Sequence, residues 1–163
     1  MEPHPITSSA TDGTLVVGID FSDCCERALL NAVTLAEHGE GQVQLELVHV
    51  FEWPGESAPP AGEYAQRSAG RGEAARTAVV AQSQASLQRL ARLCSTVVGD
   101  RVAAKIHVLI GDPAVRLLAA AELLNASLIV LGTLGRRMQP RGELGSTAER
   151  VKTGSHVPVL LVP

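Results

Sequence analysis

Short apolar runs without polar alternation are the feature that most restricts how this chain folds. Two of them, Thr14–Asp20 (TLVVGID) and Leu128–Leu131 (LIVL), carry apolar, largely branched residues at consecutive positions. Successive side chains of a strand point to opposite faces, so such a run is apolar on both faces. That pattern is typical of central parallel strands that are covered by helices on both sides.

The rest of the chain alternates between strand and helix patterns. We expect strands at 14–20, 43–51, 102–109, 128–131 and 157–162, and helices at 22–39, 73–98, 113–124 and 146–154. Crossovers between parallel strands of one sheet are right-handed and place helices on its faces. The sequence therefore predicts an α/β fold, a doubly wound five-stranded parallel sheet of order 3-2-1-4-5 with helices on both faces.

Three of the predicted helices carry start signals. Ser22 precedes the acidic first turn of one helix, and Asp112 with Pro113 at the first helical position opens another. Ser146 and Glu149 have the spacing of a capping box, so we expect the Ser146 side chain to cap the last helix.

The domain organisation is simple. Residues 1–12 are rich in Pro, Ser and Thr and predict a disordered N-terminal tail, and residues 13–163 predict a single domain. Residues 52–72 hold three prolines and four glycines, which predicts a flexible loop. A connection of this length without secondary structure is uncommon unless it is functional or disordered.

Charge and composition limit the partners that we expect. A net charge of −3 gives no field that attracts nucleic acid, and no apolar run approaches the length of a membrane span. The N-terminus has no signal-peptide pattern. Three cysteines fit neither a disulfide framework nor a zinc site. These features predict a cytoplasmic protein that binds no nucleic acid and no membrane.

A glycine-punctuated loop follows the 128–131 strand. Gly132 and Gly135 leave the strand, and Gly145 and Ser146 lead into a helix, an arrangement that suits phosphate. The loop is neither a P-loop nor a GxGxxG fingerprint. It holds Arg136, Arg137 and Arg141. With strand order 3-2-1-4-5, the ligand crevice lies between the first and fourth strands, so Asp20 is expected to face this loop.

The joint spacing of these pieces resembles the universal stress protein family. The chain is similar to that family in VVGIDFS around Asp20, in LVHV at 47–50, in GDPA at 111–114, in LIVLGTLGR at 128–136, in GSTAERV at 145–151 and in the terminal PVLLVP. In particular, Gly132, Gly135, Gly145 and Ser146 match the Gly-x2-Gly-x9-Gly-Ser motif of the members that bind ATP. The resemblance covers residues 14–163 and implies the fold already expected.

The resemblance also implies a nucleotide site, with ATP as the ligand and Mg²⁺ bridging its phosphates. Asp20, beside the backbone of Gly18 and Ile19, would lie near the ribose or adenine, Val50 would line the adenine pocket, and Leu131 and Gly132 would support the adenosine. The phosphates would lie against the glycine loop and the helix that follows it. The residues expected there are Gly135, Gly145, Ser146 and Thr147.

The function expected is that of a regulatory module that binds adenine nucleotide. The resemblance also implies a homodimer that forms through the C-terminal strand. No catalytic residue and no protein-ligated metal is expected. Apart from Glu143, no candidate general base faces the γ-phosphate, so we expect slow ATP hydrolysis at most. An adenylate-forming enzyme is not favoured, because DFSD at 20–23 is not an SGGxDS-like loop.

An alternative reading remains open. The insert of the motif is RRMQPRGEL, in which Pro140, Gly142 and Glu143 depart from the family pattern, and Glu143 would repel a phosphate if it pointed inward. The loop would then be structural, and the protein would act as a dimeric interaction module without nucleotide.

Two further sites also have competing interpretations. His49 is expected to be a packed, hydrogen-bonded histidine rather than a base. A lowered thiol pKa at a helix N-terminus is one interpretation of Cys24 and Cys25, and packing in that helix is the interpretation we favour.

Overall fold

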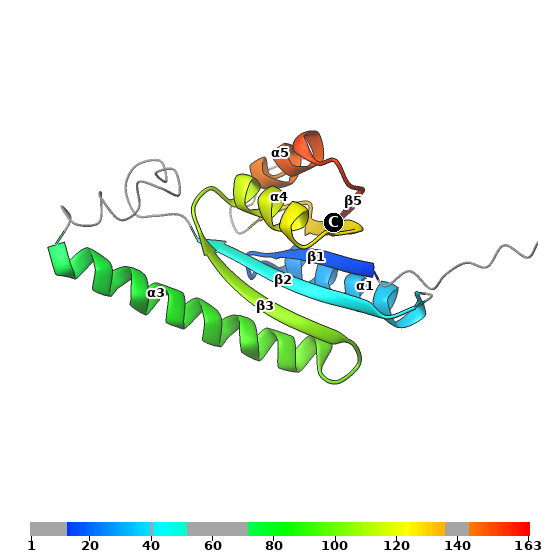
Figure 1. Ribbon diagram of the computed structural model, residues 1–163, viewed down its shortest axis with the longest axis horizontal. Helices are drawn as coiled ribbons and strands as arrows, with labels where there is room; N and C mark the ends of the chain where they lie inside the picture. Colours follow the sequence, from blue (N-terminus) through cyan, green and yellow to red (C-terminus); the bar gives the residue numbers. More distant parts are fainter. Residues whose placement is uncertain (1–12, 40, 52–71, 136–143) are drawn as a thin grey trace, which may run out of the picture.

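The computed structural model describes residues 13–39, 41–51, 72–135 and 144–163. Its strands form one sheet in the order β3-β2-β1-β4-β5, and every neighbouring pair is parallel (Figure 1). The strands are β1 (Gly13–Ile19), β2 (Val43–Phe51), β3 (Ala103–Ile110), β4 (Leu128–Gly132) and β5 (Val159–Val162). The predicted fold class and strand order are therefore confirmed.

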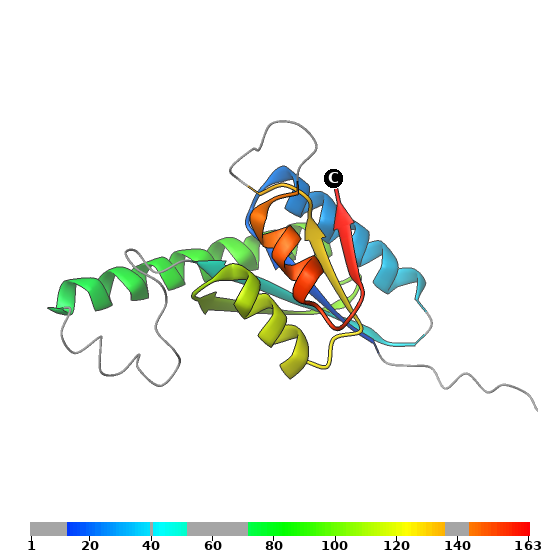
Figure 2. The same cartoon turned by 90° about the horizontal axis from the view of Figure 1, so that it is seen from above.

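Helices cover both faces of this sheet. Helices α1 (Asp23–His38) and α3 (Gly72–Leu93) pack on one face, and α4 (Pro113–Leu123) and α5 (Ser146–Gly154) pack on the other. Figure 1 shows α4 and α5 on the side of the sheet opposite α3, and Figure 2 looks onto the α4 and α5 layer. The apolar residues at consecutive strand positions therefore pack against both helix layers.

The core divides into two clusters because alternate strand residues face opposite layers. Val17 and Leu47 point towards α1, where they pack with Leu29 and Val33, and all four are fully buried. Val16 and Val48 point the other way, into the cluster built on α4 and α5. The two clusters pack both helix layers against the same strands.

The predicted caps of α1 and α4 are present. The Ser22 hydroxyl accepts a hydrogen bond from the Cys25 amide at 3.2 Å, and the Asp112 carboxylate accepts one from the Val115 amide at 3.0 Å. Each cap satisfies an amide of the first turn that has no intrahelical partner.

The predicted capping box at Ser146 is wrong. Gly145 is the N-cap of α5, and no side chain accepts a capping hydrogen bond there. The reason is that the Gly145 amide is held just beyond the end of β4, where it donates to the Thr133 carbonyl at 2.7 Å. Ser146 is consequently the first helical residue, one position too late for its hydroxyl to act as the N-cap side chain.

Some element bounds differ from the expected ones. The helix expected at 73–98 is α3 followed by a π-helical turn at Cys94–Val98, which ends where the Gly99 amide donates to the Cys94 carbonyl at 3.0 Å. The last strand begins at Val159 rather than 157, after Pro158, whose carbonyl accepts from the Ile129 amide. A proline has no amide to donate, which suits a position just before the strand.

Several predictions lie outside the described residues. These are the disordered tail at 1–12, the flexible loop at 52–72 except Gly72, which begins α3, and the loop residues 136–143 with their arginines and Glu143. Among the helices that the structure does describe, none combines the length and apolar character needed to cross a membrane.

Candidate functional site

The carboxyl ends of β1 and β4 lie side by side at the point where the strand order reverses. The register pairs Val17 with Val130, so Asp20 follows β1 directly beside the point where β4 leads into the glycine loop. A cavity of about 690 Å³ lies at this edge. All ten residues predicted to bind nucleotide line it: Gly18, Ile19, Asp20, Val50, Leu131, Gly132, Gly135, Gly145, Ser146 and Thr147.

Asp20 is the half-buried acid at the centre of this edge. Its Oδ1 accepts two hydrogen bonds from Ser22, one from the amide at 3.0 Å and one from the hydroxyl at 2.6 Å. Its Oδ2 lies against the glycine loop, because a Cβ built on Gly135 would come within 2.9 Å of it. Ser22, not Asp20, is the N-cap of α1. The carboxylate therefore faces the loop and the cavity instead of capping the helix.

The glycines of the loop are needed for close approach, not for a left-handed backbone. A Cβ on Gly132 would lie 2.8 Å from Cys24 Cβ and 3.0 Å from the Cys25 amide nitrogen. A Cβ on Gly145 would lie 3.3 Å from the Thr133 carbonyl oxygen and 3.5 Å from the Gly135 amide nitrogen. None of the three motif glycines, Gly132, Gly135 and Gly145, has a positive φ. The loop is folded tightly onto the start of α1 and onto itself.

One end of the cavity suits an anion. Ser146 and Thr147 stand in the first turn of α5, and in the described part of the chain no side chain caps that turn. The amides at a helix N-terminus and the positive end of the helix dipole favour negative charge. The two hydroxyls add donors at the same rim.

The other end of the cavity is apolar. Its walls include Val48 and Val50 of β2, Leu117 of α4 and Leu131 of β4. Gly18 lies beneath them, and a Cβ there would come within 2.3 Å of Leu131 Cδ2. The absence of a side chain at Gly18 therefore leaves space for the Leu131 side chain. An apolar slot next to an anion-binding rim suits a ligand with a flat ring at one end and negative charge at the other.

The structure adds lining residues that the sequence reasoning missed. Ala78, Val79 and Gln82 of α3 complete the cavity on the side of β2. No motif marks these residues, because a long segment separates α3 from Phe51 at the end of β2. The helical periodicity of α3 shows which of its faces is apolar, but not which part of the sheet that face packs on.

His49 is a packed and hydrogen-bonded residue, as predicted. Its Nδ1 lies 2.7 Å from the Ile19 carbonyl oxygen, and its side chain is buried. Its ring also contacts the ring of Phe21, with the centroids 4.7 Å apart. No sequence pattern marks Phe21 for this contact.

Cys25, the buried cysteine of the pair at the start of α1, has a raised thiol pKa. Burial raises the pKa of the Cys25 thiol to about 11, so the favoured interpretation, packing in the helix, is confirmed for this residue and the alternative of a lowered pKa is not. Desolvation of the thiolate outweighs the hydrogen bonds from the backbone of Asp20 and Phe21. Cys24 is half-buried, and its sulfur accepts a hydrogen bond from Arg27 Nη2 at 3.1 Å.

An ion pair joins the two helices that frame the cavity. Arg150 Nη1 of α5 lies 2.6 Å from Asp112 Oδ2 at the start of α4. The Arg150 guanidinium lowers the pKa of the Asp112 carboxyl through this charged hydrogen bond. In residues 13–39, 41–51, 72–135 and 144–163, no group of three His, Cys, Asp or Glu side chains is arranged to hold a metal ion.

The fold and the cavity together define a doubly wound α/β protein with a ligand crevice at its topological switch point. The sequence profile of the universal stress protein family matches residues 13–163. The chain belongs to the universal stress protein family.

Individual relatives agree with this membership. The chain is 30% identical over 151 residues to universal stress protein MJ0531 of Methanocaldococcus jannaschii, covering 91% of this chain and 80% of that protein. Two solved structures share the fold. One is a universal stress protein in complex with cAMP, with a TM-score of 0.61, 22% identity and coverage of 93% of this chain and 96% of that one. The other is the Archaeoglobus fulgidus universal stress protein in complex with dAMP, with a TM-score of 0.56, 19% identity and coverage of 94% and 99%.

Proposed function

We propose that this universal stress protein binds an adenine nucleotide, ATP with Mg²⁺, in the cavity between β1 and β4 and acts as a regulatory module. The observation that carries the proposal is the contact between the two predicted halves of the site. Asp20 at the end of β1 and Gly135 in the loop after β4 are so close that a Cβ on the glycine would lie 2.9 Å from the carboxylate. The solved relatives with bound cAMP and dAMP support an adenine nucleotide as the class of ligand.

The lining suggests how such a ligand would lie. The base would occupy the apolar slot beside Val50 and Leu131, and the ribose hydroxyls would donate to the Asp20 carboxylate. The phosphates would lie at the first turn of α5, beside Ser146 and Thr147. Mg²⁺ would enter with the triphosphate and be held mainly by phosphate oxygens and water. In this reading the residues bind and orient the nucleotide, and hydrolysis is slow at most.

Calorimetric titration with ATP and Mg²⁺ tests the proposal. Wild-type protein is expected to give a saturable heat of binding. Gly145→Val is expected to weaken binding about tenfold or more, because the added side chain meets the Thr133 carbonyl and the phosphate rim. Gly154→Ala, at the far end of the same helix, is the matched control, because its Cβ would meet only the end of the Leu118 side chain.

The outcomes of this titration are distinct. Circular dichroism spectra that stay unchanged in both variants show that the fold is retained. Loss of binding in Gly145→Val alone supports the phosphate role of the loop. Unchanged affinity in Gly145→Val contradicts that role, and no saturation of the wild-type protein at millimolar ATP contradicts nucleotide binding itself.

A dimeric interaction module is the second candidate, and the position of β5 favours it. This apolar strand is an edge of the sheet in the described part of the chain, and Val159, Leu160 and Leu161 are only half-buried. An open edge strand with apolar side chains is a template for pairing with another strand. A dimer through β5 is compatible with nucleotide binding, since the cavity lies at the strand ends and not along this edge.

A further inference from the structure

Phe21 has a backbone conformation that its residue type disfavours. Its φ is +63°, in the left-handed region, although it carries a bulky aromatic side chain. For residues other than glycine this region is disfavoured by roughly 5- to 30-fold. Such a residue persists only where its surroundings hold it, and such residues concentrate at functional sites.

The unusual turn at Phe21 orients the acid of the cavity. Asp20 precedes it and Ser22 follows it, and the Asp20 carboxylate accepts hydrogen bonds from both the amide and the hydroxyl of Ser22. The Ser22 hydroxyl also lies 3.4 Å from the Leu134 carbonyl in the glycine loop. The direction of the carboxylate towards Gly135 therefore depends on the conformation of the residue between Asp20 and Ser22.

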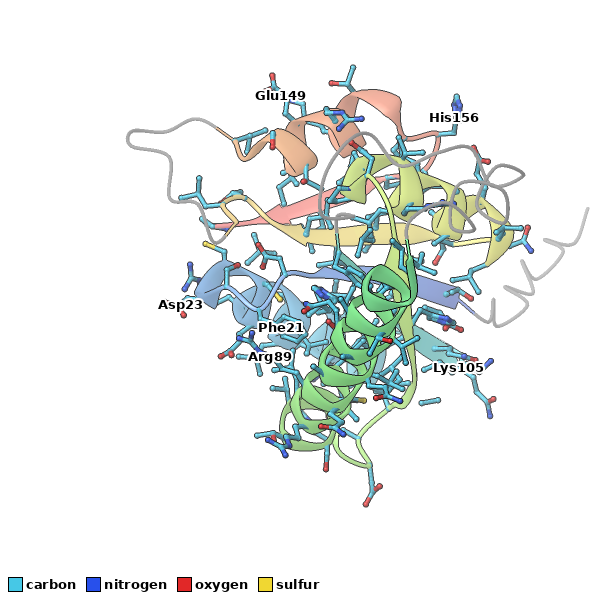
Figure 3. The ribbon with its side chains drawn as sticks, turned by 90° about the vertical axis from the view of Figure 1, so that its left-hand side faces the viewer. Phe21, Asp23, Arg89, Lys105, Glu149 and His156 are labelled. Atoms are coloured by element: carbon cyan, nitrogen blue, oxygen red, sulfur yellow. The ribbon has the colours of Figure 1, made fainter. Side chains whose placement is uncertain are left out.

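The ring of Phe21 is held from two sides by residues distant in sequence. His49 of β2 contacts it with a centroid separation of 4.7 Å, and His49 is itself fixed by its hydrogen bond to the Ile19 carbonyl. On another side, Arg89 Cζ of α3 lies 4.1 Å from the ring centroid (Figure 3). A guanidinium at this distance over an aromatic ring is attracted to the π face. These contacts oppose the backbone cost at Phe21.

We propose that Arg89, acting through the ring of Phe21, is a positioning residue for Asp20 and thereby sets the affinity of the cavity for the ribose hydroxyls of a nucleotide. The proposal rests on the function proposed above. Neither Arg89 nor Phe21 is among the described residues that line the cavity. Arg89 thus links α3 to the ligand site without touching the ligand.

The expected effect follows from populations. Without the ring contacts, residue 21 relaxes to ordinary conformations, and only a fraction of molecules keeps the Asp20 carboxylate in its binding orientation. The apparent dissociation constant rises by the inverse of that fraction. Loss of the Arg89 contact corresponds to a weakening of about two- to fivefold. Loss of the ring with the Cβ kept, as in Phe21→Ala, corresponds to roughly 5- to 30-fold.

Calorimetry on Phe21→Ala, Phe21→Gly, Arg89→Ala and the control Arg92→Ala tests the proposal with two ligands. Arg92 is an exposed arginine on the same helix. ATP presents both ribose hydroxyls, and 2′,3′-dideoxy-ATP presents neither. Phe21→Ala and Arg89→Ala are expected to weaken ATP binding and to leave dideoxy-ATP binding unchanged. Phe21→Gly is expected to bind ATP close to wild type, because glycine adopts a positive φ without cost.

A double variant adds a test of mechanism. In the Phe21→Gly background, Arg89→Ala is expected to have no further effect on ATP affinity, because the contact it removes is already absent. Such non-additivity distinguishes a link through the ring from a general effect of charge on α3.

The contrary results are equally specific. The inference fails if Arg89→Ala binds ATP like Arg92→Ala, if Phe21→Gly is as weak as Phe21→Ala, or if the variants weaken both ligands alike. Each of these leaves wild-type ATP binding in place and so leaves the proposed function standing. Absence of ATP binding by the wild-type protein instead overturns the proposed function, and this inference with it.

Discussion

Cys25 and Cys24 are neighbours in sequence but differ in their access to water. Cys25 is 1% exposed and lines the floor of the cavity, and burial raises its pKa to about 11. Because the thiolate is the reactive form, Cys25 is expected to resist alkylation at pH 8 in the folded protein. Mass spectrometry after iodoacetamide treatment should show Cys25 modified only when the protein is unfolded first. Modification of Cys25 in the folded protein would contradict this burial.

The same thiol makes a pH-dependent contribution to stability. Its folded-state pKa, about 11, exceeds the ordinary value of 9.0, so its contribution is full below about pH 9 and is lost as the pH rises towards 11. Two units of pKa correspond to about 2–3 kcal/mol in the free energy of unfolding. Urea unfolding of the wild type and of Cys25→Ala is therefore expected to converge between these pH values.

At the residue scale, the residues of the site could be predicted from the sequence, but the tertiary contacts that position them could not. The spacing of Gly132, Gly135 and Gly145 marks the loop, and Asp20 is marked by its place at the end of a buried strand. The stack of Arg89 on Phe21 joins residues 68 positions apart, and no local pattern predicts it. A positive φ at phenylalanine is likewise a product of tertiary contacts, since the intrinsic preference runs the other way.

At the scale of elements, an ion pair joins α4 and α5, the two helices that contribute residues to one side of the cavity. Arg150→Gln removes it, and Asp112→Asn removes its charge while keeping a good N-cap. Both pair members are partly exposed, so each change is expected to lower Tm by only about 1–3 °C at pH 7. The double variant is expected to lose little more than either single variant, because both remove the same interaction.

The pH dependence of this pair has a defined sign. The pKa of Asp112 is lowered in the folded protein, so the stabilisation is present above its ordinary value near 3.8 and disappears as the pH falls below it. Thermal scans should therefore show a difference between the wild type and Arg150→Gln that is full at pH 7 and shrinks as the pH is lowered below about 3.8. A difference that did not shrink at all as the pH was lowered below 3.8 would show that Arg150 acts by packing and not by its charge.

Element bounds could be predicted wherever a side chain marks them. Ser22 and Asp112 begin α1 and α4 because their oxygens accept first-turn amides, and this chemistry is local. The bounds of α5 match the predicted 146–154, but its N-cap was misplaced by one residue because a tertiary hydrogen bond from the Gly145 amide to the Thr133 carbonyl holds Gly145 at that position. The sequence at 146–149 carries a capping pattern that the fold does not use.

At the scale of the whole molecule, the open edge of β5 predicts self-association. The Pro158 carbonyl accepts a hydrogen bond from Ile129 of β4, and the Val162 carbonyl accepts one from Thr133 just after β4. The alternation of the strand therefore turns the amides of Val159 and Leu161 towards the open edge. Leu161→Pro removes one of those outward donors. We expect wild-type protein to be a dimer and this variant a monomer in size-exclusion chromatography with light scattering.

The control for this prediction is Leu161→Ala, which shortens the same side chain and keeps its amide. It is expected to remain dimeric. A wild-type protein that is monomeric at all concentrations tested, or a Leu161→Pro variant that stays dimeric, would place any association surface elsewhere.

The central claim is that one cavity joins Asp20 of β1 to the glycine loop of β4 and receives an adenine nucleotide. Calorimetric titration of the wild-type protein with ATP and Mg²⁺ tests it most directly. We expect saturable binding with one nucleotide per chain, weakened about tenfold or more in Gly145→Val and kept in Gly154→Ala. A folded wild-type protein that gives no saturable signal up to millimolar ATP would contradict it.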